Sequence, residues 1–296
     1  MRFRATLTGL AWISPWLVGF LAFMALPLGM SLYYSFTDYP LIEKPLWIGL
    51  DNYRAMVHDP VFWIVLKNTL IYAAFSIPLS TIIAVAIAAL LNQKVAGVGF
   101  YRAAIFVPVV VPAVASAMIG LWMFNGELGL VNQAVSGVAR VLHLNVAPPA
   151  WLKEHGWAMA ALIIVSLWNV GQAVVIYLAA MQEVPRSLYE AAAIDGAGPV
   201  RRWLNVTLPG VSPVVLFNVI TGIINTWQVF AVPYIMTEGE PDRSTYFYTM
   251  YLYHSAFVFQ KMGYASALAY VQFGIIMVLT GMMFLLSRRL VHYRAA

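Results

Sequence analysis

Amide side chains at helical spacing are the residues of this sequence with the most informative chemistry. Asn169 and Gln172 lie in one uncharged run, and Asn225 and Gln228 lie in another. The members of each pair are three positions apart, so each pair is expected to share one face of a helix. Sites for sugars combine such amides with hydroxyl groups and aromatic faces. One interpretation of the pattern is a binding site for a neutral, hydroxyl-rich solute.

Further polar and aromatic residues in the same apolar runs extend this candidate site. In hydrocarbon, polar side chains cost free energy unless they line a bundle interior or a cavity. The alternative is that the amides only hold helices together, at about 0.6 kcal/mol per hydrogen bond in membranes. The residues assigned to the candidate solute pathway are Trp168, Asn169, Gln172, Asn225, Thr226, Trp227, Gln228, Tyr270 and Gln272.

The composition indicates a membrane protein. The chain has 296 residues, of which 62% are hydrophobic and 10% are charged. Soluble domains carry about 25% charged residues. The absence of cysteine excludes disulfides and thiolate metal sites. We expect no metal site and no catalytic residue, since His143 and His254 stand apart from other ligand types.

Uncharged runs of about 20 residues or more predict an all-α integral membrane protein with one domain over residues 1–296. An even number of spans places both termini on one side of the membrane. Ten of the 17 basic residues then lie on that side, which predicts that it is cytoplasmic. Arg2 and Arg4 precede a run too long for a signal peptide, so we interpret this run as a retained span. The six predicted spans are approximately 10–36, 66–92, 102–125, 157–182, 208–236 and 263–288.

The segment 184–207, between the fourth and fifth predicted spans, is polar enough to fold outside the membrane. Ser187 and Glu190 have the spacing of a capping box, which predicts a helix over 188–194. Gly196 is suited to the left-handed turn that ends a helix. Pro199 then starts a second short helix over 200–208.

Pro209 is expected to close that second helix. The segment is thus predicted to form two short helices joined by a glycine turn on the cytoplasmic face. On these grounds alone Glu190 has two possible roles, which are to cap its own helix or to face another protein.

The same segment resembles a known signature. Glu190-Ala191-Ala192, three residues, Gly196, nine residues and then Val206-Thr207-Leu208-Pro209 are similar to the EAA motif of ABC importer permeases. That motif has isoleucine where this chain has Val206. The surrounding sequence LYEAAAIDGAG resembles the carbohydrate branch, with its maltose-type and glycerol-phosphate-type permeases. The resemblance implies the type I permease fold in a bacterial inner membrane, crossed several times.

In that family the loop is a coupling segment that seats in a cleft of a cytoplasmic ATPase. The resemblance implies that Glu190 pairs with a basic group on the ATPase, that Ala191 and Ala192 pack in its cleft, and that Gly196 makes the turn. Asp195 and Ala197 belong to the same predicted coupling surface. The implied partners are a second permease, usually a different homologous chain, two ATPase subunits and an extracytoplasmic solute-binding protein.

The chain itself is not expected to be an enzyme. A phosphate-binding P-loop contains a Gly-Lys pair, and none of the five lysines follows a glycine. ATP and Mg are therefore expected on the partner ATPase, with no cofactor on this chain. Together these features predict the permease subunit of an ATP-driven importer for a carbohydrate, and an oligosaccharide in particular.

Three alternatives remain open from the sequence. An ion-coupled secondary carrier would need no ATPase, although such carriers usually use carboxylates within the membrane and the uncharged runs contain none. A glycerol-phosphate importer is the alternative within the family. A membrane anchor or scaffold without a transport role is the third.

Overall fold

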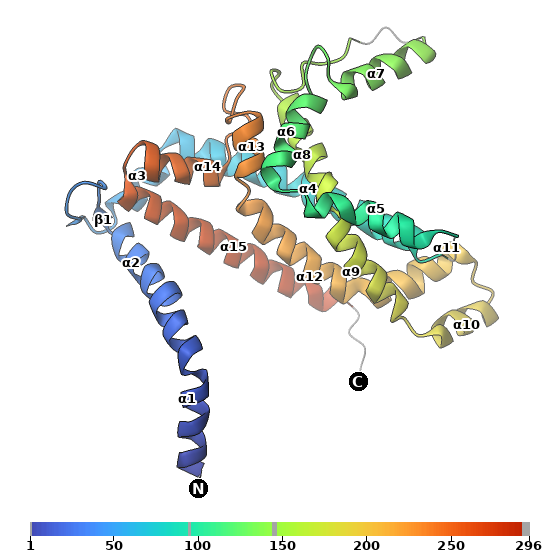
Figure 1. Cartoon of the computed structure of the whole chain (residues 1–296), viewed down its shortest axis with the longest axis horizontal. Helices are drawn as coiled ribbons and strands as arrows, with labels where there is room; N and C mark the ends of the chain where they lie inside the picture. Colours follow the sequence, from blue (N-terminus) through green and yellow to red (C-terminus); the bar gives the residue numbers. More distant parts are fainter. Residues whose placement is uncertain (1, 94–95, 144–146, 292–296) are drawn as a thin grey trace. The chain divides into compact units, whose positions relative to one another are not determined.

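The computed structural model is mostly helical and describes residues 2–93, 96–143 and 147–291 (Figure 1). Its internal contacts divide the chain into two compact units. One consists of residues 1–62 with 251–274, and the other of residues 63–250 with 275–296. The helices α4 (Pro60–Leu91), α14 (Tyr248–Tyr253) and α15 (Met262–Leu290) each have residues in both units.

The first unit begins with a long helix interrupted by a π turn. Leu26 N–H bonds to Leu21 O across this turn, so the helix widens just before Pro27, which has no N–H to donate. Asn52 then ties the end of the helix to the following strand by donating to Ser35 O (3.0 Å) and Thr37 O (2.8 Å). The remaining elements are α1 (Arg2–Phe20), η1 (Leu21–Ala25), α2 (Leu26–Ser35), the antiparallel strands β1 (Thr37–Asp38) and β2 (Leu46–Trp47), α3 (Asp51–His58) and η4 (His254–Val258).

A carboxylate with two tyrosines connects the distant segments of this unit. Asp59 accepts hydrogen bonds from Tyr251 OH, Tyr264 OH and the Val61 N–H. Burial alone raises the pKa of Asp59, but these hydrogen bonds outweigh it and hold the pKa below its ordinary value. Burial, with the adjacent Asp59, raises the pKa of Tyr251 to about 12. Both pKa shifts therefore favour the same state, in which the ionised carboxylate of Asp59 accepts a hydrogen bond from neutral Tyr251.

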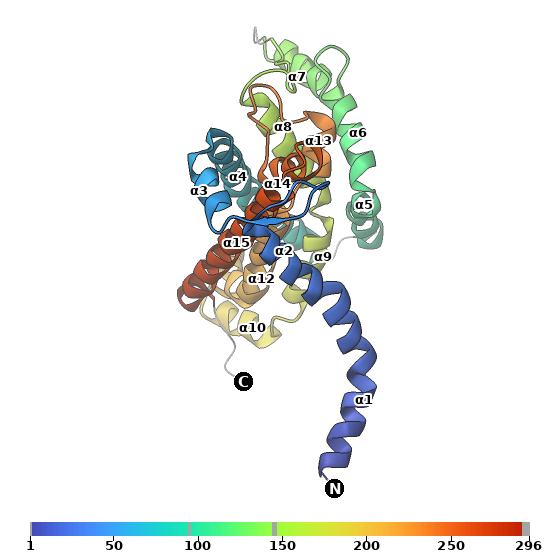
Figure 2. The same ribbon diagram turned by 90° about the vertical axis from the view of Figure 1, so that its left-hand side faces the viewer.

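The second unit packs helices around α9. Ala84 and Ala88 lie one turn apart on α4, and their small side chains allow close packing against Val174 and Leu178 of α9. α5 lies beside α9 and α13 beside α6 in Figures 1 and 2. The further elements of this unit are α5 (Val98–Val110), α6 (Ala113–Met123), α7 (Leu130–Val141), α8 (Trp157–Ser166), η2 (Leu167–Asn169), α9 (Gly171–Gln182), α10 (Arg186–Ile194), α11 (Pro199–Arg202), η3 (Trp203–Thr207), α12 (Leu208–Trp227) and α13 (Ala231–Met236).

The lengths and composition of the helices agree with a multi-pass membrane protein. Among the described residues, four helices are long and apolar enough to cross a membrane. They cover Ala11–Ser35, Pro60–Leu91, Pro199–Trp227 and Met262–Arg288. The number rises to six if α5 with α6, and α8–η2 with α9, each count as one bent span. The side on which the termini lie stays a prediction.

Three of the predicted ranges differ from continuous helices in the structure. The range 102–125 is broken by a bend of 99° between α5 and α6. Pro112 disfavours the helical conformation for Val111, whose φ and ψ are −73° and 126°. The range 157–182 bends by 49° after the 3-10 turn Leu167–Asn169. In the range 208–236 the helix ends at Trp227, and 231–236 forms the separate helix α13.

Two further helix boundaries differ from the predictions. The second predicted span, 66–92, lies within a helix that begins at Pro60. The expected short helix over 200–208 does not close at Pro209, since the helix continues from Pro199 to Trp227. Leu208 N–H bonds to Trp203 O in a π turn, so the chain passes Pro209 without losing its helical path.

Candidate functional site

The helix α10 presents Glu190 on its exposed side. Pro185 occupies the N-cap position and no side chain caps the helix, so the predicted capping box is wrong. Because α10 already begins at Arg186, both Ser187 and Glu190 lie inside it. The side chain of Glu190 is exposed and makes no hydrogen bond or ion pair with any described residue. Of the two roles predicted for Glu190, this geometry agrees with contact to another protein and disagrees with capping of its own helix.

The predicted glycine turn after α10 is confirmed. Gly196 has a φ of +72°, a conformation that residues with a Cβ seldom adopt. Ala197 N–H donates to Ala192 O at 2.9 Å and Gly196 N–H to Ala193 O at 3.1 Å, which closes the last turn of α10. Pro199 then occupies the first turn of α11, as expected.

Two side-chain hydrogen bonds attach α10 and the turn to η3 and α11, which precede α12. Tyr189 OH lies 2.8 Å from the Oγ1 of Thr207, which is buried. Arg202 Nε donates to Ala197 O at 2.6 Å. These contacts set the orientation of the segment, and its outer side stays open.

The open side of this segment is partly apolar. Ile194 is 87% exposed and Val200 is 71% exposed, and Leu188 and Leu204 are also exposed. The structure places the predicted coupling residues on or beside this surface. Glu190, Ala191, Asp195 and Gly196 are exposed, while Ala192 and Ala197 are half-buried.

A cavity of about 390 Å³ lies between α4, α9 and α12. This volume is within the range of sites for small molecules, about 300–1,000 Å³. Among the described residues that line it, none is charged. Its polar lining residues are Tyr72, Ser76, Ser80, Thr81, Ser166, Asn169, Gln172, Tyr177, Asn218, Thr221, Asn225 and Thr226.

Three of the four amide side chains in this lining are free to bind a solute, while the fourth, Asn218, donates to Val214 O at 3.0 Å within α12. The side chains of Asn169, Gln172 and Asn225 make no hydrogen bond within the part of the chain that the structure describes. Ser76 Oγ is buried and likewise has no partner among the described residues. Amides that held helices together would instead be bonded across a helix interface. Their arrangement favours a solute contact over a purely structural role.

Five of the predicted pathway residues do not line this cavity. Trp227 is 1% exposed and packs against Tyr248, with the ring centroids 6.0 Å apart. The expectation that Asn225 and Gln228 share a helix face is wrong, because α12 ends between them at Trp227. Trp168 is exposed and precedes the cavity residue Asn169 in the chain. Tyr270 OH donates to Leu28 O at 2.5 Å in the first unit. Gln272 is buried.

The contribution of α4 is the part that sequence reasoning missed. Tyr72, Ser76 and Ser80 recur at intervals of four residues, so they form one stripe along α4. This periodicity is visible in the sequence. However, the same stretch of sequence contains many other small and hydroxyl residues, so these three positions are not distinguished from their neighbours.

A glycine at the start of α9 positions the two amides of that region. A Cβ on Gly171 would overlap the carbonyl oxygen of Ile105 and would lie 2.9 Å from Val109 Cγ2. Only glycine therefore allows α5 to approach α9 this closely. The bend beside Gly171 places both Asn169 and Gln172 on the cavity.

The fold and these two sites define a helical membrane protein of the solute-permease class. The family described as "Binding-protein-dependent transport system inner membrane component" matches residues 76–292. The chain belongs to this family and is an inner membrane component of an ABC transport system. It is a transport subunit.

Individual relatives support the same assignment over nearly the full chain. The probable ABC transporter permease protein YesP of Bacillus subtilis (strain 168) is 35% identical, covering 99% of this chain and 94% of that protein. The lactose transport system permease protein LacF of Rhizobium radiobacter is 34% identical, over 95% of this chain and 94% of that protein.

Solved structures show the same fold. A chain of a bacterial ABC transporter involved in the import of the acidic polysaccharide alginate superposes with a TM-score of 0.85. It is 20% identical and covers 99% of this chain and 100% of that chain. The alginate transporter in complex with an alginate pentasaccharide-bound periplasmic protein gives a TM-score of 0.80 at 20% identity, over 97% of this chain and 96% of that chain.

Proposed function

We propose that this chain is the permease subunit of an ATP-driven importer for a neutral carbohydrate, and for an oligosaccharide in particular. The observation that carries this proposal is the cavity between α4, α9 and α12, with its hydroxyl groups and the amides of Asn169, Gln172 and Asn225, which have no partner among the described residues. Neutral donors and acceptors match the hydroxyl groups of a sugar, and a pathway of this kind places no fixed charge beside the solute.

The relatives support a carbohydrate. LacF is named for lactose transport and the superposed structures are of an alginate importer. Alginate is acidic, and a glycerol-phosphate would also be anionic. Either anion would be best held by a basic side chain, and none is present among the described lining residues. The lining therefore favours an uncharged sugar.

The test for the solute site compares two amides that are close in sequence but differently placed. Asn225 lines the cavity and Gln228 does not. In the transporter reconstituted in liposomes, Asn225→Ala removes one hydrogen-bonding group, worth about 0.5–1.5 kcal/mol. We expect the solute concentration for half-maximal uptake to rise about 2- to 12-fold, with a smaller change for Gln228→Ala. Equal effects of the two variants would contradict the proposed site.

We further propose that the segment 184–207 docks on a partner ATPase, which binds ATP and Mg. The support is the exposed Glu190 beside the apolar residues Ile194 and Val200, a surface that suits a protein cleft. A second permease subunit and an extracytoplasmic binding protein complete the assembly in this proposal. The cytoplasmic position of this segment and of both termini belongs to it.

The coupling role is tested with Glu190→Ala and, as a matched control, Glu127→Ala. Both glutamates are exposed, but Glu127 lies in the connection between α6 and α7. Glu190→Ala is expected to weaken co-purification of the ATPase or to lower the solute-stimulated ATPase rate, while Glu127→Ala leaves both unchanged. If Glu190→Ala behaves like the control, Glu190 is not an ATPase contact.

The alternative of an ion-coupled carrier predicts uptake by this chain alone. Purified chain in liposomes, with an ion gradient and without ATPase or ATP, is expected to show no uptake. Transport under these conditions would refute the importer assignment. A scaffold role instead predicts that Asn225→Ala leaves transport unchanged.

A further inference from the structure

A second hollow lies on the opposite side of α9 from the solute cavity. Residues of α9 alternate between the two, since Ala173, Ile176 and Tyr177 line the cavity whereas Val175 and Leu178 line the second hollow. It has a volume of about 500 Å³. We call it the α5–α9 groove and define it by Arg102, Ile105, Phe106, Val175, Leu178 and Gln182.

The groove combines apolar walls with a single cation. Ile105, Phe106, Val175 and Leu178 form its walls, and Phe106 and Val175 are exposed. Arg102 is the charged residue among the described residues of the lining. An apolar surface of this kind on a membrane helix faces either lipid or another subunit.

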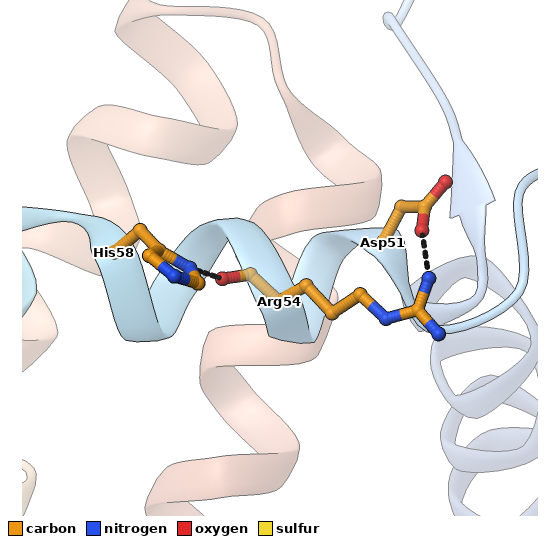
Figure 3. Close-up of polar contacts among 3 residues, drawn as sticks. All are labelled: Asp51, Arg54 and His58. Carbon is orange, nitrogen blue, oxygen red and sulfur yellow. Dashed lines mark hydrogen bonds and ion pairs between the residues drawn. The ribbon is translucent and has the colours of Figure 1, made fainter.

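Arg102 lacks a counter-ion within the described chain. Its Nη2–H donates to Leu91 O over a long distance of 3.4 Å, and its buried Nε has no acceptor among the described residues. The ion pair found among the described residues joins Arg54 Nη1 to Asp51 Oδ1 at 3.0 Å, between exposed side chains of α3 (Figure 3). In the same helix, His58 Nδ1–H donates to Arg54 O at 2.8 Å. A partly buried guanidinium without an anion is costly, so an external anion is favoured at this position.

The occupant that satisfies both parts of the groove is a lipid with an acidic headgroup. We propose that the α5–α9 groove binds an anionic phospholipid, with its phosphate on Arg102 and an acyl chain along Ile105, Phe106 and Leu178. The planar guanidinium suits a phosphate because it donates two parallel hydrogen bonds. The amide of Gln182, also on the lining, supplies a further donor. Basic pockets between membrane helices bind headgroups in this way.

The experiment is native mass spectrometry of the purified full-length chain, titrated with phosphatidylglycerol or phosphatidylcholine. We expect the wild-type chain to retain phosphatidylglycerol more strongly, and Arg102→Gln to reduce that preference about tenfold. Arg140→Gln is the control, since Arg140 is exposed on α7, away from the groove. It is expected to keep the wild-type preference.

Two further measurements decide between the possible occupants. Val175→Trp fills the groove and leaves Arg102 in place, so it is expected to lower binding of both lipids without unfolding the protein. This variant also carries the test if Arg102→Gln does not fold. An unchanged preference in Arg102→Gln, full binding in Val175→Trp, or displacement of phosphatidylglycerol by inorganic phosphate alone would overturn the proposal.

Discussion

Replacing Gly171 by alanine tests the packing that positions the solute cavity. A Cβ at this position would overlap Ile105 O and approach Val109 Cγ2 to 2.9 Å. The backbone of α5 or α9 must therefore shift, and overpacking of this kind typically costs about 1–3 kcal/mol.

Gly222 on α12 supplies the matched control. A Cβ there would meet Ile77 side-chain atoms at 3.6 and 3.7 Å, which is ordinary contact. Alanine is also favoured over glycine inside a helix by up to about 1 kcal/mol. We therefore expect Gly222→Ala to be neutral or stabilising, and Gly171→Ala to be less stable than it by about 1–3 kcal/mol or more. That difference corresponds to about 5- to 150-fold in the ratio of folded to unfolded protein.

The assay is unfolding in mixed detergent micelles followed by tryptophan fluorescence, for which the chain has 10 tryptophans. Because Gly171 lies between Asn169 and Gln172, Gly171→Ala is also expected to raise the solute concentration for half-maximal uptake. If Gly171→Ala and Gly222→Ala have the same stability, α5 and α9 do not pack as closely as described and the reasoning fails.

Two further predictions concern the polar contacts outside the cavity. Tyr189→Phe removes the hydrogen bond to Thr207, worth about 0.5–1.5 kcal/mol, so amide hydrogen exchange in α10 should rise about 2- to 12-fold; unchanged exchange would show that this bond does not hold α10. Asp59 has a lowered pKa when folded, so its carboxylate stabilises the protein above the unfolded pKa of about 4, and that stability is lost as the pH falls through the folded pKa. The melting-temperature difference between wild type and Asp59→Asn should thus be present at neutral pH and shrink in acid, whereas Asp51→Asn, which breaks an exposed ion pair, should have little effect at either pH; a difference that does not depend on pH would exclude the proposed role of the Asp59 carboxylate.

Local chemistry explains which predictions from the sequence were confirmed. The turn at Gly196 and the helix start at Pro199 depend on backbone preferences of single residues, so the structure reproduces both. The predicted capping box was wrong because Ser187 and Glu190, three positions apart, have a spacing that also occurs inside a helix. With Pro185 as its N-cap, α10 begins two positions earlier than the pattern requires.

Proline showed the limit of local reasoning most clearly. Pro112 breaks the predicted span 102–125, whereas Pro209 lies in a helix that runs on to Trp227. The difference is that a π turn, with Leu208 N–H bonded to Trp203 O, precedes Pro209. The sequence contains no signal that distinguishes these two outcomes.

The sequence by itself determined the membrane class, the approximate ranges of the apolar helices and the glycine turn of the segment 184–207. These follow from composition and from backbone preferences, which act over a few residues. Only the tertiary structure decided that Asn169, Gln172, Asn225 and Thr226 line one cavity with a stripe of α4, while Trp227 is buried and Gln228 lies beyond the helix end. A cavity requires faces of helices that are distant in the chain to meet, and that depends on packing such as the contact of Gly171 with α5.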